Sequence, residues 1–201
     1  MADSEDPDPR VPPSFRLVRV GVYFYAGLMA AALVWRMGFF AEPIFFASAT
    51  DRVAGIRFGR DLMAGLAAGI ALVVLSFMAS VHTRWGDALA RDLAAAIGPL
   101  GIPNALLLAF ASGLAEEMFF RGALQPRVGL IAASVLFACM HFVPRRSLLP
   151  WTIFALGAGL LFGALFTWTG NLLAPVTAHI VVNAVNLPLL ERRFGSRAED
   201  A

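Results

Sequence analysis

The sequence predicts an all-α polytopic membrane protein, a bundle of about six transmembrane helices. Hydrophobic residues make up 59% of the chain and its mean hydropathy is +0.72, whereas a soluble domain is about 45–50% apolar. Only 15% of the residues are charged, against about 25% in soluble domains. Apolar stretches long enough to span a bilayer recur between short polar segments, which favours several membrane helices.

The charge of the chain argues against a nucleic-acid partner, and its cysteine content argues against a disulfide. The formal net charge is +2, and all 16 basic residues are arginine. No arginine cluster is long enough to follow a nucleic-acid backbone, so we expect no nucleic-acid partner. The single cysteine, Cys139, excludes an internal disulfide.

The N-terminal half is predicted to hold two membrane helices. Residues 1–15 are acidic and proline-rich, which indicates a disordered tail, and they lack the basic and apolar regions of a signal peptide. Residues 16–100 form the first predicted unit, with spans over 17–40 and 61–81. Residues 83–100 alternate charged and apolar residues, which is typical of a helix lying on the membrane surface.

The second unit, residues 101–190, is predicted to hold four helices and the chemistry. The spans cover about 102–124, 128–142, 149–168 and 172–190, and a charged tail follows at 191–201. Short turns join these helices, which predicts antiparallel neighbours. The glycines of the fifth helix, Gly157, Gly159 and Gly163, predict close backbone packing.

Two adjacent glutamates lie inside the apolar stretch 102–124. A carboxylate at the centre of a bilayer costs roughly 2.5–3.5 kcal/mol even on lenient insertion scales. Glu117 and Arg121 are four residues apart and can pair on one helix face. Glu116 points about 100° away from Glu117, so it can act on a substrate or on water. The alternative is an ion-paired packing device.

Four further polar residues lie in the apolar helices that follow. His141 ends the predicted fourth helix, and an interfacial capping role is its simpler interpretation. His179 and Asn183 share one face of the sixth helix, where an interhelical hydrogen bond is the alternative, worth about 0.6 kcal/mol on average. Asn186 extends the same stripe.

Depth in the membrane links these residues. We call the membrane face at which the third predicted helix ends, near residues 125–127, face X. Counting 1.5 Å per residue from face X places Glu116, His141, His179 and Asn183 roughly 10–16 Å deep. Independent packing devices have no reason to share one layer, so the residues predict a single site.

The residue types favour hydrolysis of an acyl bond, most plausibly a peptide bond. A carboxylate beside a histidine can hold a water molecule and take its proton. A second histidine and a carboxamide can donate hydrogen bonds to an oxyanion. No serine elbow and no cysteine opposite a base is present, which argues against a covalent nucleophile.

The three motifs resemble a known family. The pattern EExxxR at Glu116–Arg121, FxxxH at Phe137–His141 and HxxxN at His179–Asn183, in this order, is similar to that of the CPBP family. This family holds CAAX prenyl proteases and the bacteriocin-processing Abi group. The resemblance covers about residues 102–190.

The resemblance implies a glutamate-dependent intramembrane endopeptidase. Glu116 would be the general base and His141 would hold the attacking water. His179 and Asn183 would form the oxyanion hole, and Glu117 and Arg121 would support the site. Family members are regarded as metal-independent, so no cofactor is expected. A divalent metal is the minor alternative, because glutamate and histidine are zinc-type ligands, although HExxH is absent.

The arginines suggest an orientation. With the N-terminus inside, the cytoplasmic segments hold ten arginines and the outside segments hold five, which satisfies the positive-inside rule. The ten are Arg10, Arg16, Arg19, Arg84, Arg91, Arg145, Arg146, Arg192, Arg193 and Arg197; the five are Arg36, Arg52, Arg57, Arg60 and Arg127. Face X then lies outside a bacterial inner membrane, which suits the myxosortase-like relatives that process exported proteins.

The expected partner is a membrane-anchored or lipid-modified protein or peptide, held among membrane lipids. A non-catalytic member of the same family, such as a bacteriocin self-immunity factor or a scaffold, is the main alternative. A proton-coupled transporter is a further one, because intramembrane glutamate and histidine also build proton relays. The absence of an inverted repeat argues against it.

Overall fold

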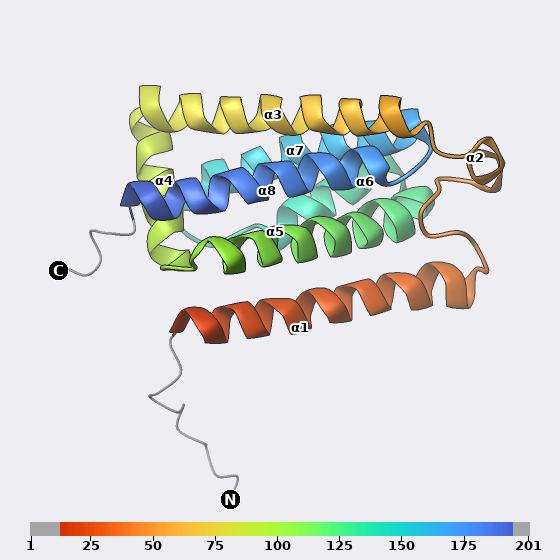
Figure 1. The fold of residues 1–201 in the computed structure, drawn as a ribbon, viewed down its shortest axis with the longest axis horizontal. Helices are drawn as coiled ribbons and strands as arrows, with labels where there is room; N and C mark the ends of the chain where they lie inside the picture. The colour runs from red at the N-terminus through yellow and green to blue at the C-terminus, as the bar shows by residue number, and fades with distance from the viewer. Residues whose placement is uncertain (1–12, 195–201) are drawn as a thin grey trace, which may run out of the picture.

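The computed structural model describes residues 13–194. Its elements are α1 (Pro13–Leu33), η1 (Val34–Phe39), α2 (Ala49–Ala54), α3 (Phe58–His82), α4 (Arg84–Ile97), α5 (Ile102–Glu117), η2 (Met118–Leu124), α6 (Gln125–Met140), η3 (Arg146–Leu148), α7 (Leu149–Thr169) and α8 (Leu173–Phe194). The long helices lie side by side, α4 crosses one end of the bundle and α2 lies at the other end (Figure 1). The all-α prediction is therefore confirmed for this part of the chain.

The predicted tails fall largely outside the described residues. Residues 1–12 of the N-terminal tail and residues 195–201 of the C-terminal tail are not described. Pro13 begins α1, and α8 continues to Phe194, beyond its predicted end at residue 190. Glu191, which was assigned to the tail, lies in α8, and its carboxylate accepts a hydrogen bond from the backbone N–H of Gly101 at 3.0 Å.

The described chain has five helical segments long and apolar enough to cross a membrane, where about six were expected. The third and fourth predicted helices form one run, Ile102–Met140. Pro126 suggested a turn, but it stands in the first turn of α6, where proline costs little. The chain turns instead at Gly129, whose φ is 83°, a conformation that favours glycine.

α6 still makes a passage antiparallel to α7. The Gln125 side chain donates to the Gly163 carbonyl at 2.9 Å, and the His141 carbonyl accepts from Thr152 at 3.3 Å. Beyond Gly129, however, α6 has about 11 residues and is roughly 16 Å long. The fourth passage is therefore a helix about half as long as the hydrocarbon core is thick.

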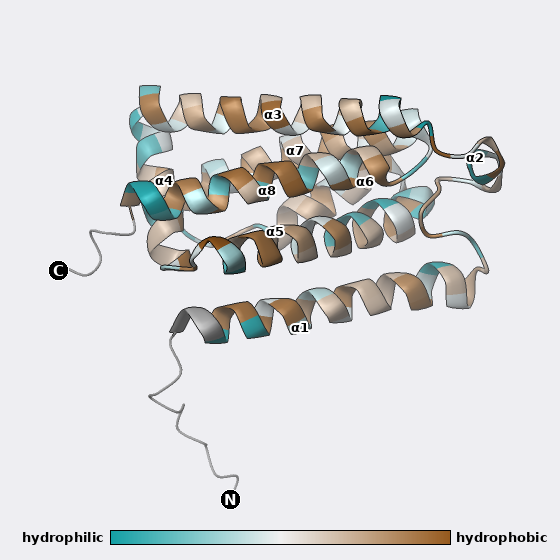
Figure 2. Ribbon diagram, viewed as in Figure 1, coloured by the Kyte–Doolittle hydropathy of each residue, from teal (hydrophilic) through white to brown (hydrophobic). Residues whose placement is uncertain are grey.

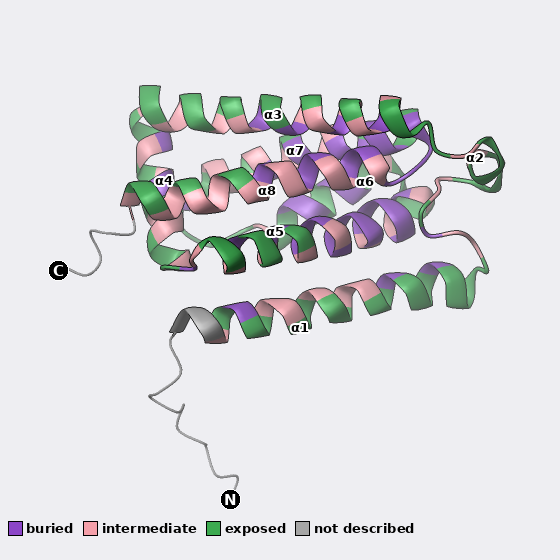
Figure 3. Cartoon of the chain, in the orientation of Figure 1, coloured by how far each residue is buried: buried purple, intermediate pink, exposed green. Residues whose placement is uncertain are grey.

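α8 is the centre of the bundle and packs against α3, α5 and α7. Buried residues concentrate where these helices meet (Figure 3), and hydrophobic residues recur along all the long helices (Figure 2). Exposed apolar residues such as Val20, Met63 and Ile153 form a surface suited to lipid. Gly159 and Gly163 of α7 face α6, as the sequence suggested, whereas Gly157 meets nothing within 4 Å.

Polar contacts tie the N-terminal unit to the turn between α7 and α8. Asp61, at the start of α3, is fully buried. It accepts a hydrogen bond from the Asn171 side chain at 2.7 Å and forms an ion pair with Arg60 at 2.6 Å. The backbone N–H of Ala47 donates to the carbonyl of Gly170 at 3.0 Å. The segment before α2 is thus held against face X.

We predict that Gly65→Ala destabilises the bundle, whereas Gly157→Ala does not. A Cβ atom at Gly65 would lie 2.5 Å from the backbone oxygen of Ala174 in α8, and such overpacking costs about 1–3 kcal/mol. Thermal unfolding in detergent measures both variants. Equal unfolding temperatures would contradict the close contact of α3 with α8.

Candidate active site

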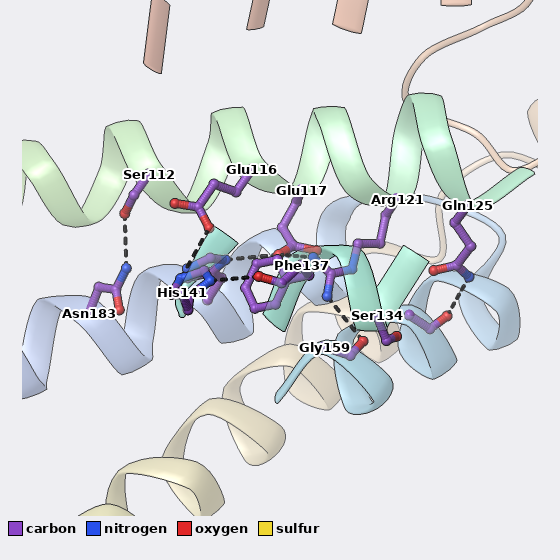
Figure 4. Close-up of polar contacts among 12 residues, drawn as sticks. Ser112, Glu116, Glu117, Arg121, Gln125, Ser134, Phe137, His141, Gly159 and Asn183 are labelled. Carbon is purple, nitrogen blue, oxygen red and sulfur yellow. Dashed lines mark hydrogen bonds and ion pairs between the residues drawn. The ribbon is translucent and has the colours of Figure 1, made fainter. Parts of the chain in front are cut away.

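A buried ion pair and a histidine form the centre of the site. Arg121 Nη1 donates to Glu117 Oε1 at 3.0 Å, as the four-residue spacing predicted. His179 Nδ1 lies 2.8 Å from the same oxygen. Glu117, Arg121 and His179 are 0%, 1% and 5% exposed. Three helical elements, α5, η2 and α8, are therefore joined at one carboxylate (Figure 4).

The environment of Arg121 compensates for its burial. Its second amino group donates to the carbonyl of Gly159 in α7 at 3.0 Å. The guanidinium lies 4.5 Å from the ring centre of Phe137 and 5.6 Å from that of Phe162, within the range of cation–π attraction. A buried charge is tolerated when it is paired and hydrogen-bonded, and Arg121 meets both conditions.

Glu116 faces His141 on the other side of α5. Glu116 Oε2 lies 3.8 Å from His141 Nε2, and the Glu116 side chain is only 10% exposed. The imidazole is oriented by its other nitrogen, because Nδ1 lies 2.8 Å from the carbonyl oxygen of Phe137. A carbonyl only accepts hydrogen bonds, so Nδ1 carries the proton.

This tautomer leaves two acceptors facing each other. In the neutral ring, Nε2 presents a lone pair to the carboxylate. Glu116 Oε2 is buried and has no hydrogen-bond partner among the described residues. A contact of 3.8 Å is too long for a direct hydrogen bond, and a polar contact of this length invites a bridging water. One water molecule can donate to both atoms.

Asn183 is linked to the same side of α5. Its amide donates to the hydroxyl of Ser112 at 2.9 Å. Ser112 lies one turn before Glu116, so both side chains share a helix face. Asn186, which was expected to extend the stripe, accepts instead from Ser76 of α3 at 3.2 Å and belongs to helix packing.

Two contributors were missed by the sequence analysis. Ser112 could have been found from its four-residue spacing to Glu116. Tyr25 of α1 gave no signal, because its helix carries no motif, yet its phenol interacts with both Glu116 and Ser112. α1 therefore contributes to the environment of the free carboxylate.

Phe137 joins the two halves of the arrangement. Its ring centre lies 4.5 Å from that of His141 and 6.0 Å from that of His179. All six residues singled out from the sequence thus lie in one connected set of contacts. Cys139 is exposed and lies outside it. Within residues 13–194, no three His, Cys, Asp or Glu side chains are grouped closely enough to hold a metal ion.

Comparisons with known proteins bear on the same segment. Residues 98–185 match the family described as type II CAAX prenyl endopeptidase Rce1-like. The uncharacterized protein YpbD of Bacillus subtilis (strain 168) is 43% identical over 86 residues, which cover 42% of this chain and 44% of YpbD. The matched part is therefore less than half of that relative. No solved structure matches the chain.

The matched range contains all six residues predicted from the three motifs, and it leaves α1 and α3 outside. The resemblance inferred from the motifs is thereby confirmed. Residues 98–185 of this helical membrane protein are thus similar to the Rce1-like family of type II CAAX prenyl endopeptidases.

Proposed function

We propose that the chain is an intramembrane endopeptidase that hydrolyses a peptide bond near the C-terminus of a membrane-anchored or lipid-modified protein. The observation that carries this proposal is the pair of facing acceptors, Glu116 Oε2 and His141 Nε2, 3.8 Å apart. When His141 is neutral, both atoms are hydrogen-bond acceptors, and a water molecule between them can donate to each. A water molecule held between Glu116 and His141 would be the nucleophile that attacks the peptide bond.

Glu116 acts as the general base in this proposal. The water oxygen attacks the peptide carbonyl carbon while its proton passes to the Glu116 carboxylate. The proton then passes to the leaving nitrogen as the carbon–nitrogen bond breaks, so the acid form returns to carboxylate. Positioned proton transfer of this kind contributes about 10²–10⁴-fold to a rate. His141 orients the water.

His179 and Asn183 are assigned to the oxyanion. The Nδ1–H of His179 points to Glu117, so Nε2 donates to an oxyanion only when the ring is an imidazolium. Asn183 uses one amide hydrogen on Ser112 and has a second available.

Glu117, Arg121 and Tyr25 are positioning residues. The Glu117–Arg121 pair orients His179 and anchors α5 to α7 through Gly159. Tyr25 places a hydroxyl beside Glu116 and so holds the carboxylate rotamer toward His141. None of these roles requires a metal or another cofactor.

We propose that the N-terminus is cytoplasmic and that the site opens toward face X on the outer side of a bacterial inner membrane. The excess of arginines on the other face supports this orientation. The antiparallel course of α6 supports it as well, because six passages return the chain to the side on which it starts.

Exchanging Glu116 or Glu117 for glutamine should distinguish a loss of catalysis from a loss of stability. Glu116→Gln removes the base and should lower peptide hydrolysis by at least 10²-fold while the unfolding temperature is kept. Glu117→Gln leaves Arg121 buried without its counter-charge and should destabilise the protein by about 3 kcal/mol. Proteomics of exported and lipidated proteins reports cleavage, and thermal unfolding reports stability.

The same pair of variants tests the rival function. A self-immunity factor or a scaffold keeps its cellular effect when Glu116 becomes glutamine, because no proton is moved. Unchanged C-terminal processing in the Glu116→Gln strain, with the variant folded and present at normal level, would contradict the proposed enzyme.

We predict that a cysteine at Val53 is labelled by a membrane-impermeant maleimide in intact cells, and that a cysteine at Ala96 is not. Val53 lies in α2 at face X and is 90% exposed, whereas Ala96 is exposed in α4 at the other end. Cys139→Ser provides the background for both. The reverse labelling pattern would place face X in the cytoplasm.

A further inference from the structure

A pocket lined by arginines lies at face X, apart from the site described above. Its volume is about 370 Å³. It lies between the end of η1, the segment before α2 and the beginning of α6. The charged residues that line it are Arg36, Glu42, Arg52 and Arg127, and small side chains such as Ala47 leave room at its rim.

The charges in this pocket do not balance. Arg36 Nη1 and Arg127 Nη2 pair with the same oxygen, Glu42 Oε2, at 2.8 and 2.7 Å. The Arg52 guanidinium has no partner among the described residues. Three guanidiniums thus face one carboxylate, and the lining carries a formal charge of +2.

Arg36 also has an unused donor. Its side chain is 2% exposed, and Nη2 donates to the carbonyl of Ala47 at 3.2 Å. Nε is buried and has no hydrogen-bond partner among residues 13–194. Leaving a charged donor unsatisfied is costly, so the protein alone does not complete the hydrogen bonding of Arg36.

Aromatic side chains place the pocket at the depth of lipid headgroups. Trp35, Phe39 and Phe45 are 43%, 73% and 48% exposed at this end of the bundle, and aromatic residues gather at membrane–water interfaces. The Arg127 guanidinium lies 3.9 Å from the ring centre of Phe40. α2 and its flanking segments extend past the ends of the long helices (Figure 1).

We propose that this pocket binds the phosphate group of an anionic membrane phospholipid. Guanidiniums match the geometry of phosphate oxygens and bind them with charge-assisted hydrogen bonds. The exposed side chains of Phe39 and Phe45 nearby are suited to the acyl chains. A bound headgroup would tie η1, α2 and α6 together. The proposal is independent of the proposed hydrolysis.

The test uses the full chain in nanodiscs of phosphatidylcholine that contain a minor fraction of spin-labelled phosphatidylglycerol. Arg52→Gln removes one pocket charge without breaking an ion pair. Arg57→Gln is the matched control, because Arg57 is exposed on the same connection but does not line the pocket. We expect Arg52→Gln to weaken association of the labelled lipid about fivefold and Arg57→Gln to leave it unchanged.

Three results would overturn the proposal. An equal loss in Arg52→Gln and Arg57→Gln would mean diffuse attraction to the surface rather than a site. If inorganic phosphate at the same concentration as the labelled lipid displaces that lipid, the pocket is a site for free anions and not for a lipid headgroup. Arg127→Gln is the second pocket variant, and a loss at least as large as that of Arg52→Gln is expected. Unchanged association in both pocket variants would also overturn the proposal.

Discussion

The structure depends on one buried interaction, the shared use of the Glu117 carboxylate by Arg121 and His179. Both glutamate and arginine would be prohibitive alone in an apolar bundle, and pairing is what permits them. The pair fixes α5 against α7 through the carbonyl of Gly159 and against α8 through His179. Because this acid is committed, its neighbour Glu116 is the one left facing His141 across a gap.

Much of the site could be predicted because its geometry is local. The rise and rotation of a helix assign Glu117 and Arg121 to one face, assign Glu116 to another, and place the four polar residues at a similar depth. The position of the turn after the third predicted helix was not predicted, because the periodicity of a helix does not determine where the chain turns. Pro126 fits both a turn and a first helical turn, and the reversal at Gly129 depends on a positive φ. The sequence therefore predicted two separate helices at 102–124 and 128–142, whereas the structure has one helical run, Ile102–Met140, that turns at Gly129.

Residues 98–185, which match the family, have a different role from the N-terminal helices, which lie outside the match. Residues 98–185 carry every motif residue. α3 supplies the buried Asp61 that binds Asn171, and α1 supplies Tyr25 beside Glu116. Neither contribution was predictable, because each depends on which helices are neighbours in space, and no periodic pattern in the first hundred residues marks these positions. A fragment limited to the matched range would contain the motifs but not the packing that holds them.

The half-length of α6 has a consequence for hydration. The helix ends at Met140, and residues 142–147, which follow His141, are exposed. Non-helical backbone at membrane depth is tolerated only where it is enclosed by protein or lines a wet cavity. The stretch that follows His141 is therefore expected to face water or protein rather than lipid, which would bring water close to the imidazole.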